Sequence, residues 1–157
     1  MRKQSGFSLI ELLIVVAIIL IIAAIAIPNL LRARIASNES SAVASIRTIN
    51  TAMISYNSSY PSVGYAANLT TLTGTCTGGV LPTSTNACLI DTTLASGAKS
   101  GYSFNAQGTS SGYAAWASPL TINTTGVNSF CSVADAVVRE IPGTSVSTCA
   151  GTETPLQ

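Results

Sequence analysis

The sequence predicts an α+β protein in which one long N-terminal α-helix, with an apolar first half and an amphipathic second half, packs on a small antiparallel β-sheet with disulfide-stapled loops. Three observations predict this fold. Residues 7–27 are almost entirely apolar, and residues 28–59 carry apolar side chains at helical spacing. The second half of the chain holds short strand-like runs separated by turns that contain glycine.

The composition limits the classes of function that the chain can have. With 157 residues it has room for one domain, and its charged fraction of 8% is far below the roughly 25% of soluble domains. The mean hydropathy is +0.47. The absence of histidine removes the most common general base and metal ligand. A formal net charge of +1 gives no electrostatic reason to expect a nucleic-acid partner.

Residues 7–27 are long enough to cross a membrane. Only Ser8 and Glu11 in this segment are not apolar, and as a helix it would span roughly 31 Å, close to the thickness of a bilayer core. Arg2 and Lys3 precede it, which predicts a cytoplasmic N-terminus by the positive-inside rule. The segment exceeds the apolar run of an ordinary secretory signal, and no small-residue cleavage site follows it. A single-pass anchor is the simplest interpretation.

Glu11 does not fit a simple anchor. An ionisable side chain inside an apolar helix costs roughly 2.5–3.5 kcal/mol to insert, so we expect it to be functional and paired. No basic residue of this chain can reach it except those at the extreme N-terminus. A cation from another molecule would solve the problem, and a free α-amino group at Phe7, exposed by cleavage just before it, is one such cation.

Residues 6–18 (GFSLIELLIVVAI) resemble the N-terminus of type IV prepilins, and the similarity continues through residues 25–28 (IAIP). The resemblance implies that a membrane prepilin peptidase cleaves between Gly6 and Phe7 on the cytoplasmic side, and that Phe7 is then N-methylated. It also implies that the apolar helix is retained and assembles into a helical filament. In that family, the glutamate that matches Glu11 neutralises the N-terminal amine of a neighbouring subunit.

The helix is expected to continue past Pro28. This proline removes one hydrogen bond and predicts a kink or a local loosening, either as a tolerated membrane-helix proline or as a hinge. Pro61 disfavours helix at the preceding residue, so we expect the helix to end near residues 57–59. One apolar stripe at helical spacing is expected to face the sheet: Leu31, Ile35, Ala42, Ile46, Ile49, Met53 and Tyr56.

The rest of the chain predicts a long loop followed by a meander. Residues 61–101 are rich in Ser, Thr, Gly and Asn, with short apolar pieces at residues 69–72 and 87–90 that favour a short helix or strand. Three or four antiparallel strands follow, with a turn over residues 107–112. The expected strands are residues 101–105, 113–117, 129–133 and 136–139. This pattern also resembles, more weakly, the sheet of pilin-like proteins.

The four cysteines lie after the helix, on the side expected to be outside: Cys76, Cys88, Cys131 and Cys149. An even number of cysteines in an oxidising compartment favours disulfides, and four allow three connectivities. We prefer Cys76–Cys88 and Cys131–Cys149, because each pair closes a short loop worth about 3 kcal/mol by chain-entropy estimates. A zinc site is disfavoured, since there is no histidine and no C-x-x-C spacing.

The sequence shows no constellation typical of an enzyme. Four carboxylates follow the helix, and their spacing does not resemble a metal loop, so we expect surface, cap or turn roles and no metal or cofactor. They are Asp91, Asp135, Glu140 and Glu153. Only Lys99 and Arg139 are basic after Asn57, so this part has no electrostatic footprint for direct nucleic-acid binding.

The sequence therefore predicts a structural subunit of a type IV pilus. Its expected parts are a leader (residues 1–6), a transmembrane and filament-core half-helix (7–27), an amphipathic half-helix (28–59) and a globular head (60–157). Expected partners are copies of itself, the prepilin peptidase and the pilus assembly machinery of the inner membrane. The precursor would be a single-pass inner-membrane protein, and the product an extracellular filament. The alternatives are a pseudopilin of a type II secretion system and an uncleaved, membrane-anchored binding module.

Overall fold

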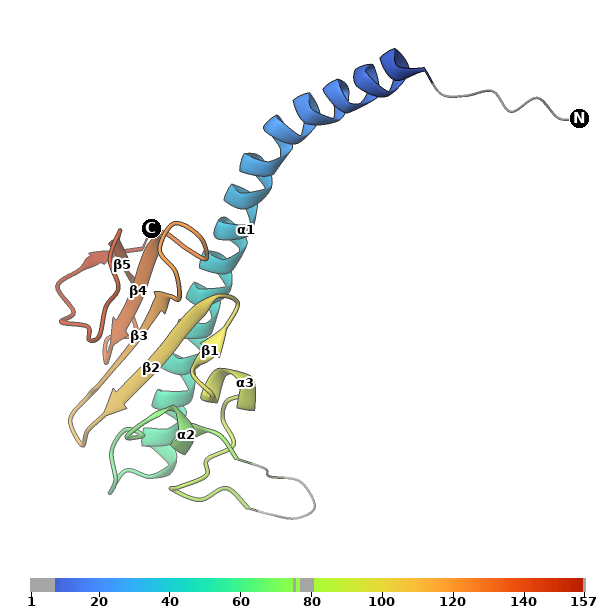
Figure 1. Cartoon of the computed structure of the whole chain (residues 1–157). Helices are drawn as coiled ribbons and strands as arrows, with labels where there is room; N and C mark the ends of the chain where they lie inside the picture. Colours follow the sequence, from blue (N-terminus) through green and yellow to red (C-terminus); the bar gives the residue numbers. More distant parts are fainter. Residues whose placement is uncertain (1–7, 75, 77–80, 157) are drawn as a thin grey trace, which may run out of the picture. The chain divides into compact units, whose positions relative to one another are not determined.

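The structure, a computed structural model, describes residues 8–74, 76 and 81–156 (Figure 1). The chain forms two compact units, one ending at Arg34 and the other beginning at Ile35. The elements are α1 (Leu9–Ser59), α2 (Leu69–Leu72), α3 (Thr92–Ala95), β1 (Ala98–Lys99), β2 (Tyr102–Gly108), β3 (Tyr113–Pro119), β4 (Asn128–Val133), β5 (Arg139–Pro142) and β6 (Thr154–Pro155). We call the unit from Ile35 onward the head unit.

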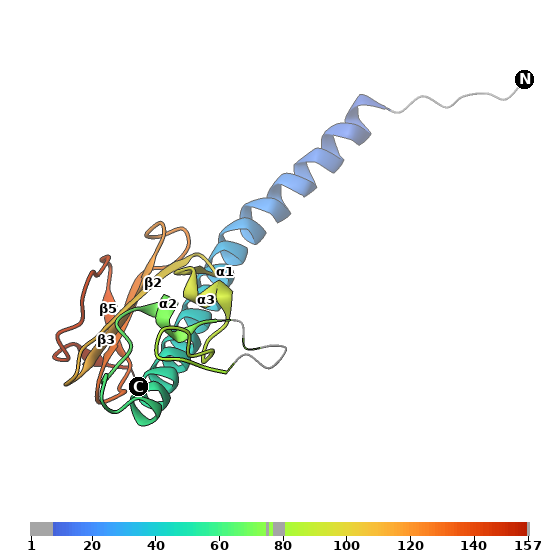
Figure 2. The same cartoon turned by 90° about the horizontal axis from the view of Figure 1, so that it is seen from below.

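Helix α1 is a single element of 51 residues that runs through Pro28. Its end at Ser59 confirms the boundary that Pro61 predicts. The remaining expectation at Pro28, a kink or hinge, stays a prediction. Within the head unit α1 lies along one face of the sheet, as Figure 2 shows from below.

In the described residues the sheet has six antiparallel strands in the order β1-β2-β3-β4-β5-β6. The expected antiparallel meander is confirmed, but the expected number of three or four strands is wrong. The sequence pattern missed β1 and β6, which have two residues each and carry no detectable alternation. These short strands form the edges of the sheet, where little backbone is left open for further pairing.

Most strand boundaries differ from expectation by one to three residues. The run expected over residues 136–139 pairs only from Arg139 onward, because Ala136 takes a positive φ of 58° that breaks the extended backbone. The turn expected over residues 107–112 is shorter, since Gln107 and Gly108 pair with β3. The connection holds a helix at residues 69–72, as one alternative predicted, while residues 87–90 are irregular.

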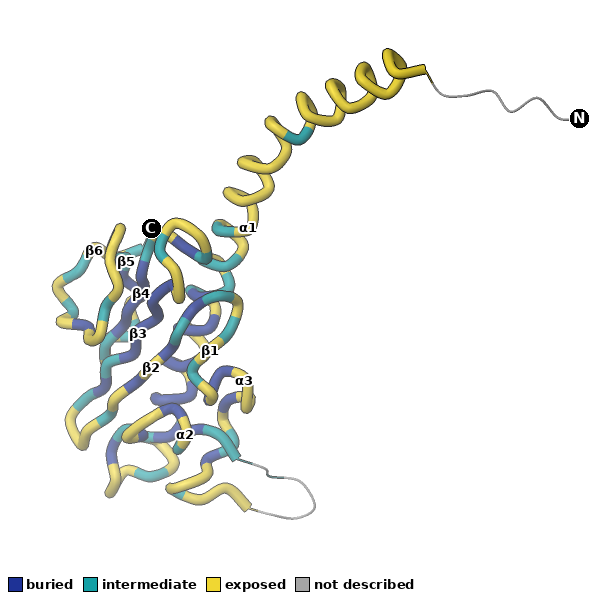
Figure 3. The backbone as a smooth tube through the Cα atoms, viewed as in Figure 1, coloured by how far each residue is buried: buried dark blue, intermediate teal, exposed yellow. Residues whose placement is uncertain are grey.

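The core lies between α1 and the sheet, where buried residues gather in Figure 3. Five residues of the predicted stripe are buried: Ala42, Ile46, Ile49, Met53 and Tyr56. Ile35 is half-buried, and Leu31, in the first unit, is 42% exposed. The central strands present buried alanines to this core at Ala106, Ala115 and Ala117. Small side chains at these positions leave room for the large residues of the helix, as close packing requires.

A second, smaller cluster covers the other face of the sheet. Trp116 packs with the Cys131–Cys149 disulfide, and Val146 and Ile141 pack against them. The disulfide holds the C-terminal segment over this face. The other disulfide joins Cys76 to Cys88 within the connection before the sheet. Both pairings match the connectivity expected from short loop closure.

The two short helices of the connection begin at side-chain caps. Asn68 Oδ1 accepts the N–H of Thr71 at 3.0 Å at the start of α2, and Asp91 Oδ1 accepts the N–H of Leu94 at 2.7 Å at the start of α3. Each cap satisfies a backbone donor that has no partner inside the helix. The connection is therefore held by local hydrogen bonds as well as by its disulfide.

A buried amide ties α1 to the sheet and to the loop after β4. Asn50 is 4% exposed, and its Nδ2 donates to Ser132 Oγ at 2.9 Å and to the carbonyl of Ala136 at 3.2 Å. Its Oδ1 accepts from the Tyr113 hydroxyl at 3.0 Å. Burial raises the pKa of Tyr113 to about 12, so this hydroxyl stays protonated and can donate at neutral pH.

Replacing Asn50 should test this network. We expect Asn50→Ala to lower the free energy of unfolding by about 2 kcal/mol, because it removes the hydrogen bonds that the buried amide makes to Ser132, Ala136 and Tyr113. Thermal unfolding of the full chain in detergent, followed by circular dichroism, measures the loss. Thr51→Ala is the control, since its exposed hydroxyl bonds only to the Arg47 carbonyl, and it should shift stability by less than about 0.5 kcal/mol. Equal losses in the two variants would contradict the assignment.

Candidate assembly site

The predicted site residues are spread along the chain. Gly6 and Phe7 lie outside the described residues. Glu11 lies in the first turn of α1, and Pro28 lies inside the same helix. The cysteines belong to the head unit. The residues expected to act in processing and assembly therefore all belong to the segment up to Pro28.

Glu11 forms a capping contact at the start of α1. Its Oε2 accepts the backbone N–H of Ser8 at 2.9 Å, while the N–H of Leu12 donates to the Ser8 carbonyl at 3.2 Å. A glutamate three residues after the N-cap that reaches back to the N-cap N–H is one half of a capping box. A carboxylate in the first turn is also favoured by the helix dipole.

This partner was missed by the sequence reasoning, which looked only for cations. The S-x-x-E spacing of Ser8 and Glu11 is a known start signal for helices and could have revealed it. The contact uses one carboxylate oxygen. Glu11 is exposed, so its other oxygen can accept from a second donor, including a cation of another molecule.

The first half of α1 exposes a continuous apolar surface. By length and composition, α1 is the one helix among the described residues that could cross a membrane, and none of its most apolar stretch is buried. Its large residues are between 45% and 79% exposed from Leu9 to Ile27. Complete burial of each such side chain would be favourable by about 1.5–3 kcal/mol of free energy. This surface therefore requires a cover of lipid or protein.

Most exposed residues of α1 in the head unit are small, apart from Arg47 and Ile54. Among the exposed residues of α1 that follow Ile35, Arg47 is the one that carries a charge. Three hydroxyls on this part of the helix donate to carbonyls four residues earlier: Thr48 to Ala44, Thr51 to Arg47 and Ser59 to Ser55. These hydroxyls are satisfied without water. The face is thus less dependent on solvent than a helix surface lined with charges.

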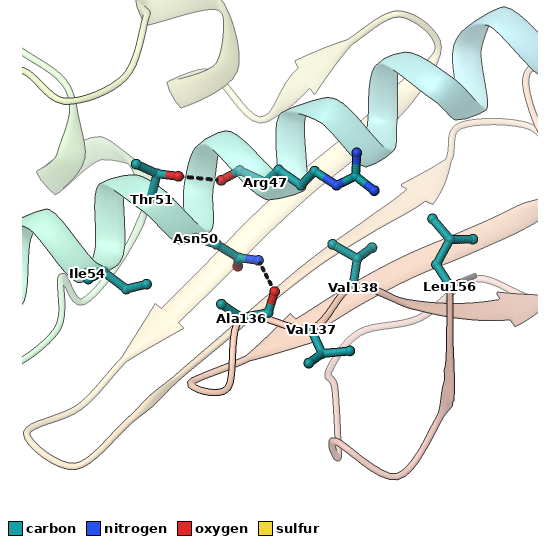
Figure 4. Close-up of a pocket in the computed structure, with 8 residues that line it drawn as sticks. All are labelled: Arg47, Asn50, Thr51, Ile54, Ala136, Val137, Val138 and Leu156. Carbon is teal, nitrogen blue, oxygen red and sulfur yellow. Dashed lines mark hydrogen bonds between the residues drawn. The ribbon is translucent and has the colours of Figure 1, made fainter.

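A groove runs beside α1 in the head unit (Figure 4). Its volume is about 380 Å³, and it is lined by Arg47, Asn50, Thr51, Ile54, Ala136, Val137, Val138 and Leu156. Asn50 lies at its inner side with its amide bonded to Ala136, and Arg47 is the one ionisable residue in the lining. A single guanidinium with apolar neighbours can bind a carboxylate, but it offers no acid–base pair for catalysis.

The carboxylates of the head unit mostly hold backbone. Glu39 Oε1 accepts the N–H groups of Val127 and Asn128 at 2.9 and 3.0 Å. Hydrogen bonds from the Arg139 guanidinium lower the pKa of Asp135, which forms an ion pair with it. The N–H of Ala150 lowers the pKa of Glu153. The cap and turn roles expected for Asp135 and Glu153 are in line with these contacts, whereas the sequence predicts no role for Glu39.

One group of side chains has the spacing of a metal site. Cys131, Cys149 and Glu153 bring their ligand atoms within 4.8 Å of one another. The two sulfurs are joined to each other, and a disulfide lacks the thiolate that binds a metal ion. The group therefore does not fit a metal centre.

The long N-terminal helix, the antiparallel six-stranded sheet and the two disulfides fit the α+β fold of pilins. Residues 1–27 match the family described as the prokaryotic N-terminal methylation motif. This match includes Gly6, Phe7 and Glu11, the residues that carried the resemblance to prepilins.

Three relatives are similar to the chain. The type IV wide pilus major component PilA4 of Thermus thermophilus is 64% identical over 39 residues, which is 25% of this chain and 30% of that protein. The type IV major pilin protein PilA of Myxococcus xanthus is 48% identical over 54 residues, 34% of this chain and 24% of that protein. The type II secretion system core protein G of Vibrio cholerae is 40% identical over 65 residues, 40% of this chain and 44% of that protein.

The matched segments thus span less than half of each relative. No solved structure matches the chain. The motif and the relatives confirm the resemblance to type IV pilins and pseudopilins.

The ion pair of Asp135 and Arg139 predicts a pH dependence. Because the folded pKa of Asp135 is lowered, the pair adds stability above the ordinary carboxyl pKa of about 3.9, and this contribution is lost as the pH falls through the lower folded value. We expect Asp135→Asn to melt below wild type at pH 7 and the difference to vanish in strong acid. Glu140→Gln is the control, since the Glu140 side chain has no hydrogen-bond partner among the described residues. A constant difference at all pH values would contradict the ion-pair explanation.

Proposed function

We propose that this chain is a structural subunit of a type IV pilus, polymerised through the apolar half of α1. The observation that carries the proposal is the exposed apolar surface of residues 9–27, which begins beside a carboxylate at Glu11 and lies within the methylation motif. A helix of this kind needs to be covered, and copies of itself or a bilayer can cover it. The similarity to two type IV pilins supports the proposal.

In the proposed pathway the precursor sits in the inner membrane with its N-terminus in the cytoplasm. A prepilin peptidase cleaves between Gly6 and Phe7, and Phe7 is then N-methylated. Arg2 and Lys3 leave with the leader. The apolar helix stays in the bilayer until the assembly machinery transfers it to the filament, which lies outside the cell. The match to the methylation motif over residues 1–27 supports these steps.

Glu11 has a second role in this proposal. Its contact with the Ser8 N–H orders the first turn, but this neutral donor leaves the negative charge uncompensated. Burial among other helices would then be costly unless a cation comes with it. The amine that cleavage creates at Phe7 of a neighbouring copy supplies that cation. The resulting pair would fix the axial position of each copy relative to the next.

Two alternatives follow from the same features. The similarity to core protein G of Vibrio cholerae favours a pseudopilin of a type II secretion system as the second candidate. Electron microscopy of a deletion strain separates the two, because only a pilin deletion removes surface filaments. In the other alternative the chain is an uncleaved membrane-anchored binding module, and no filament forms.

The intact mass of the native protein tests processing. We expect a chain that begins at Phe7 and carries one added methyl group on its α-amino nitrogen, because the motif directs both modifications. Mass spectrometry of protein extracted from membranes measures this directly. A chain that starts at an unmodified Met1 would rule out both the pilin and the pseudopilin hypotheses.

Variants of Glu11 separate capping from charge pairing. We expect Glu11→Ala and Glu11→Gln to be cleaved and methylated, but to give at least about tenfold fewer filaments than wild type, because each removes the charge that attracts the amine. Glu11→Gln keeps an amide oxygen that can accept the Ser8 N–H. Sheared filaments quantified by immunoblot give the yield, and wild-type yield from Glu11→Gln would reduce the role of Glu11 to capping.

A further inference from the structure

The groove beside α1 holds a cation without a partner. In the described part of the chain the Arg47 guanidinium forms no hydrogen bond or ion pair, and Arg47 is one of the residues that line the groove (Figure 4). Asp135, the carboxylate beside the Ala136–Val138 side of the groove, is already bound to Arg139. Apolar side chains also line the groove: Ile54 is 46% exposed and Val137 is 39% exposed. The groove therefore fits an apolar side chain accompanied by a carboxylate.

An apolar side chain and a carboxylate, Leu89 and Asp91, lie near β1, at the other edge of the sheet in the same unit. Leu89 is 37% exposed, and the exposed Asp91 follows it after one buried residue. Asp91 Oδ1 caps α3, while its Oδ2 accepts no hydrogen bond among the described residues. Helix α3 contacts β1 at one end of the sheet. The groove lies at the opposite end, where Val138 precedes β5 and Leu156 follows β6.

We propose that the groove of one copy receives Leu89 and Asp91 of a neighbouring copy, with Asp91 pairing with Arg47. This inference rests on the proposed filament. A helical polymer joins one surface of a subunit to a different surface of the next, so it needs two complementary patches on separate sides of the unit. The groove is basic and concave, and the Leu89–Asp91 segment is acidic and exposed.

The charge of the head unit supports this pairing. From Ile35 onward the chain has five carboxylates and three basic side chains, a formal charge of −2. Neighbouring head units therefore repel one another unless their few cations are placed at the contact. Arg139 is bound to Asp135, and Lys99 lies on β1, at the same edge as Asp91. Arg47, which lines the groove, is therefore the cation of the head unit that can pair with a carboxylate of another copy at this site.

A double-mutant cycle tests the pair. We expect Arg47→Gln and Asp91→Ser each to lower the filament yield on the order of fivefold, as expected for one lost ion pair, and the double variant to be no worse than either alone. Serine keeps the α3 cap, so a loss cannot be assigned to a broken helix start. Glu140→Gln removes a carboxylate of β5 that does not line the groove, and it should keep the wild-type yield. Multiplied losses in the double variant, or wild-type yield in both single variants, would overturn the pairing.

Photo-crosslinking locates the contact directly. With a benzophenone amino acid at Leu89, irradiated filaments should give a dimer whose crosslinked peptide contains residues 47–54, 136–138 or 156. The same amino acid at Val63, which is 47% exposed, should not reach these residues. Crosslinks from Leu89 to another region would refute the contact while leaving the filament intact. If the wild-type chain formed no filament at all, the proposed function itself would fail.

Discussion

The exposed apolar half of α1 is the constraint on which the function of this molecule depends. Burial of apolar surface is favourable without regard to direction, so lipid and a bundle of identical helices satisfy residues 9–27 almost equally. In the proposed filament Glu11 would break this equality, because a bilayer core offers no cation to a carboxylate while the N-terminal amine of a neighbouring copy would supply one. In the proposed mechanism, apolar burial holds the copies together and the single charge selects the filament over the membrane and sets the register.

The head unit also has few charged side chains. Alanines at Ala106, Ala115 and Ala117 let α1 approach the sheet closely, and Asn50 links the helix to β4 and to the loop that follows it. Most carboxylates hold backbone donors or an ion pair instead of solvating the surface. The few charged groups of the head unit are therefore largely used within its own fold.

Much of this architecture could be predicted from the sequence, because it depends on strong local patterns. The apolar run and the helical stripe ending before Pro61 each point to one structure, and the cysteine spacing favours one of the three possible connectivities. The two-residue strands β1 and β6 could not be predicted, since their pairing is set by the neighbouring strands and not by their own residues. The groove beside Arg47 joins residues far apart in the chain, which no local pattern reveals. The capping contact of Glu11 could be predicted from the S-x-x-E spacing, although the charge of Glu11 alone suggests only a cationic partner.

The outward face of α1 in the head unit can also be covered by a neighbouring copy, although it is more polar than the first half of the helix. Thr48, Thr51 and Ser59 satisfy their hydroxyls on the helix itself, so covering them does not leave unpaired donors. A neighbour can therefore approach this face without losing hydrogen bonds to water. Because such a face provides little directional preference, the scarce ionic groups must determine which contacts form. On this reasoning Glu11 specifies the packing of the helices, and Arg47 specifies that of the head units.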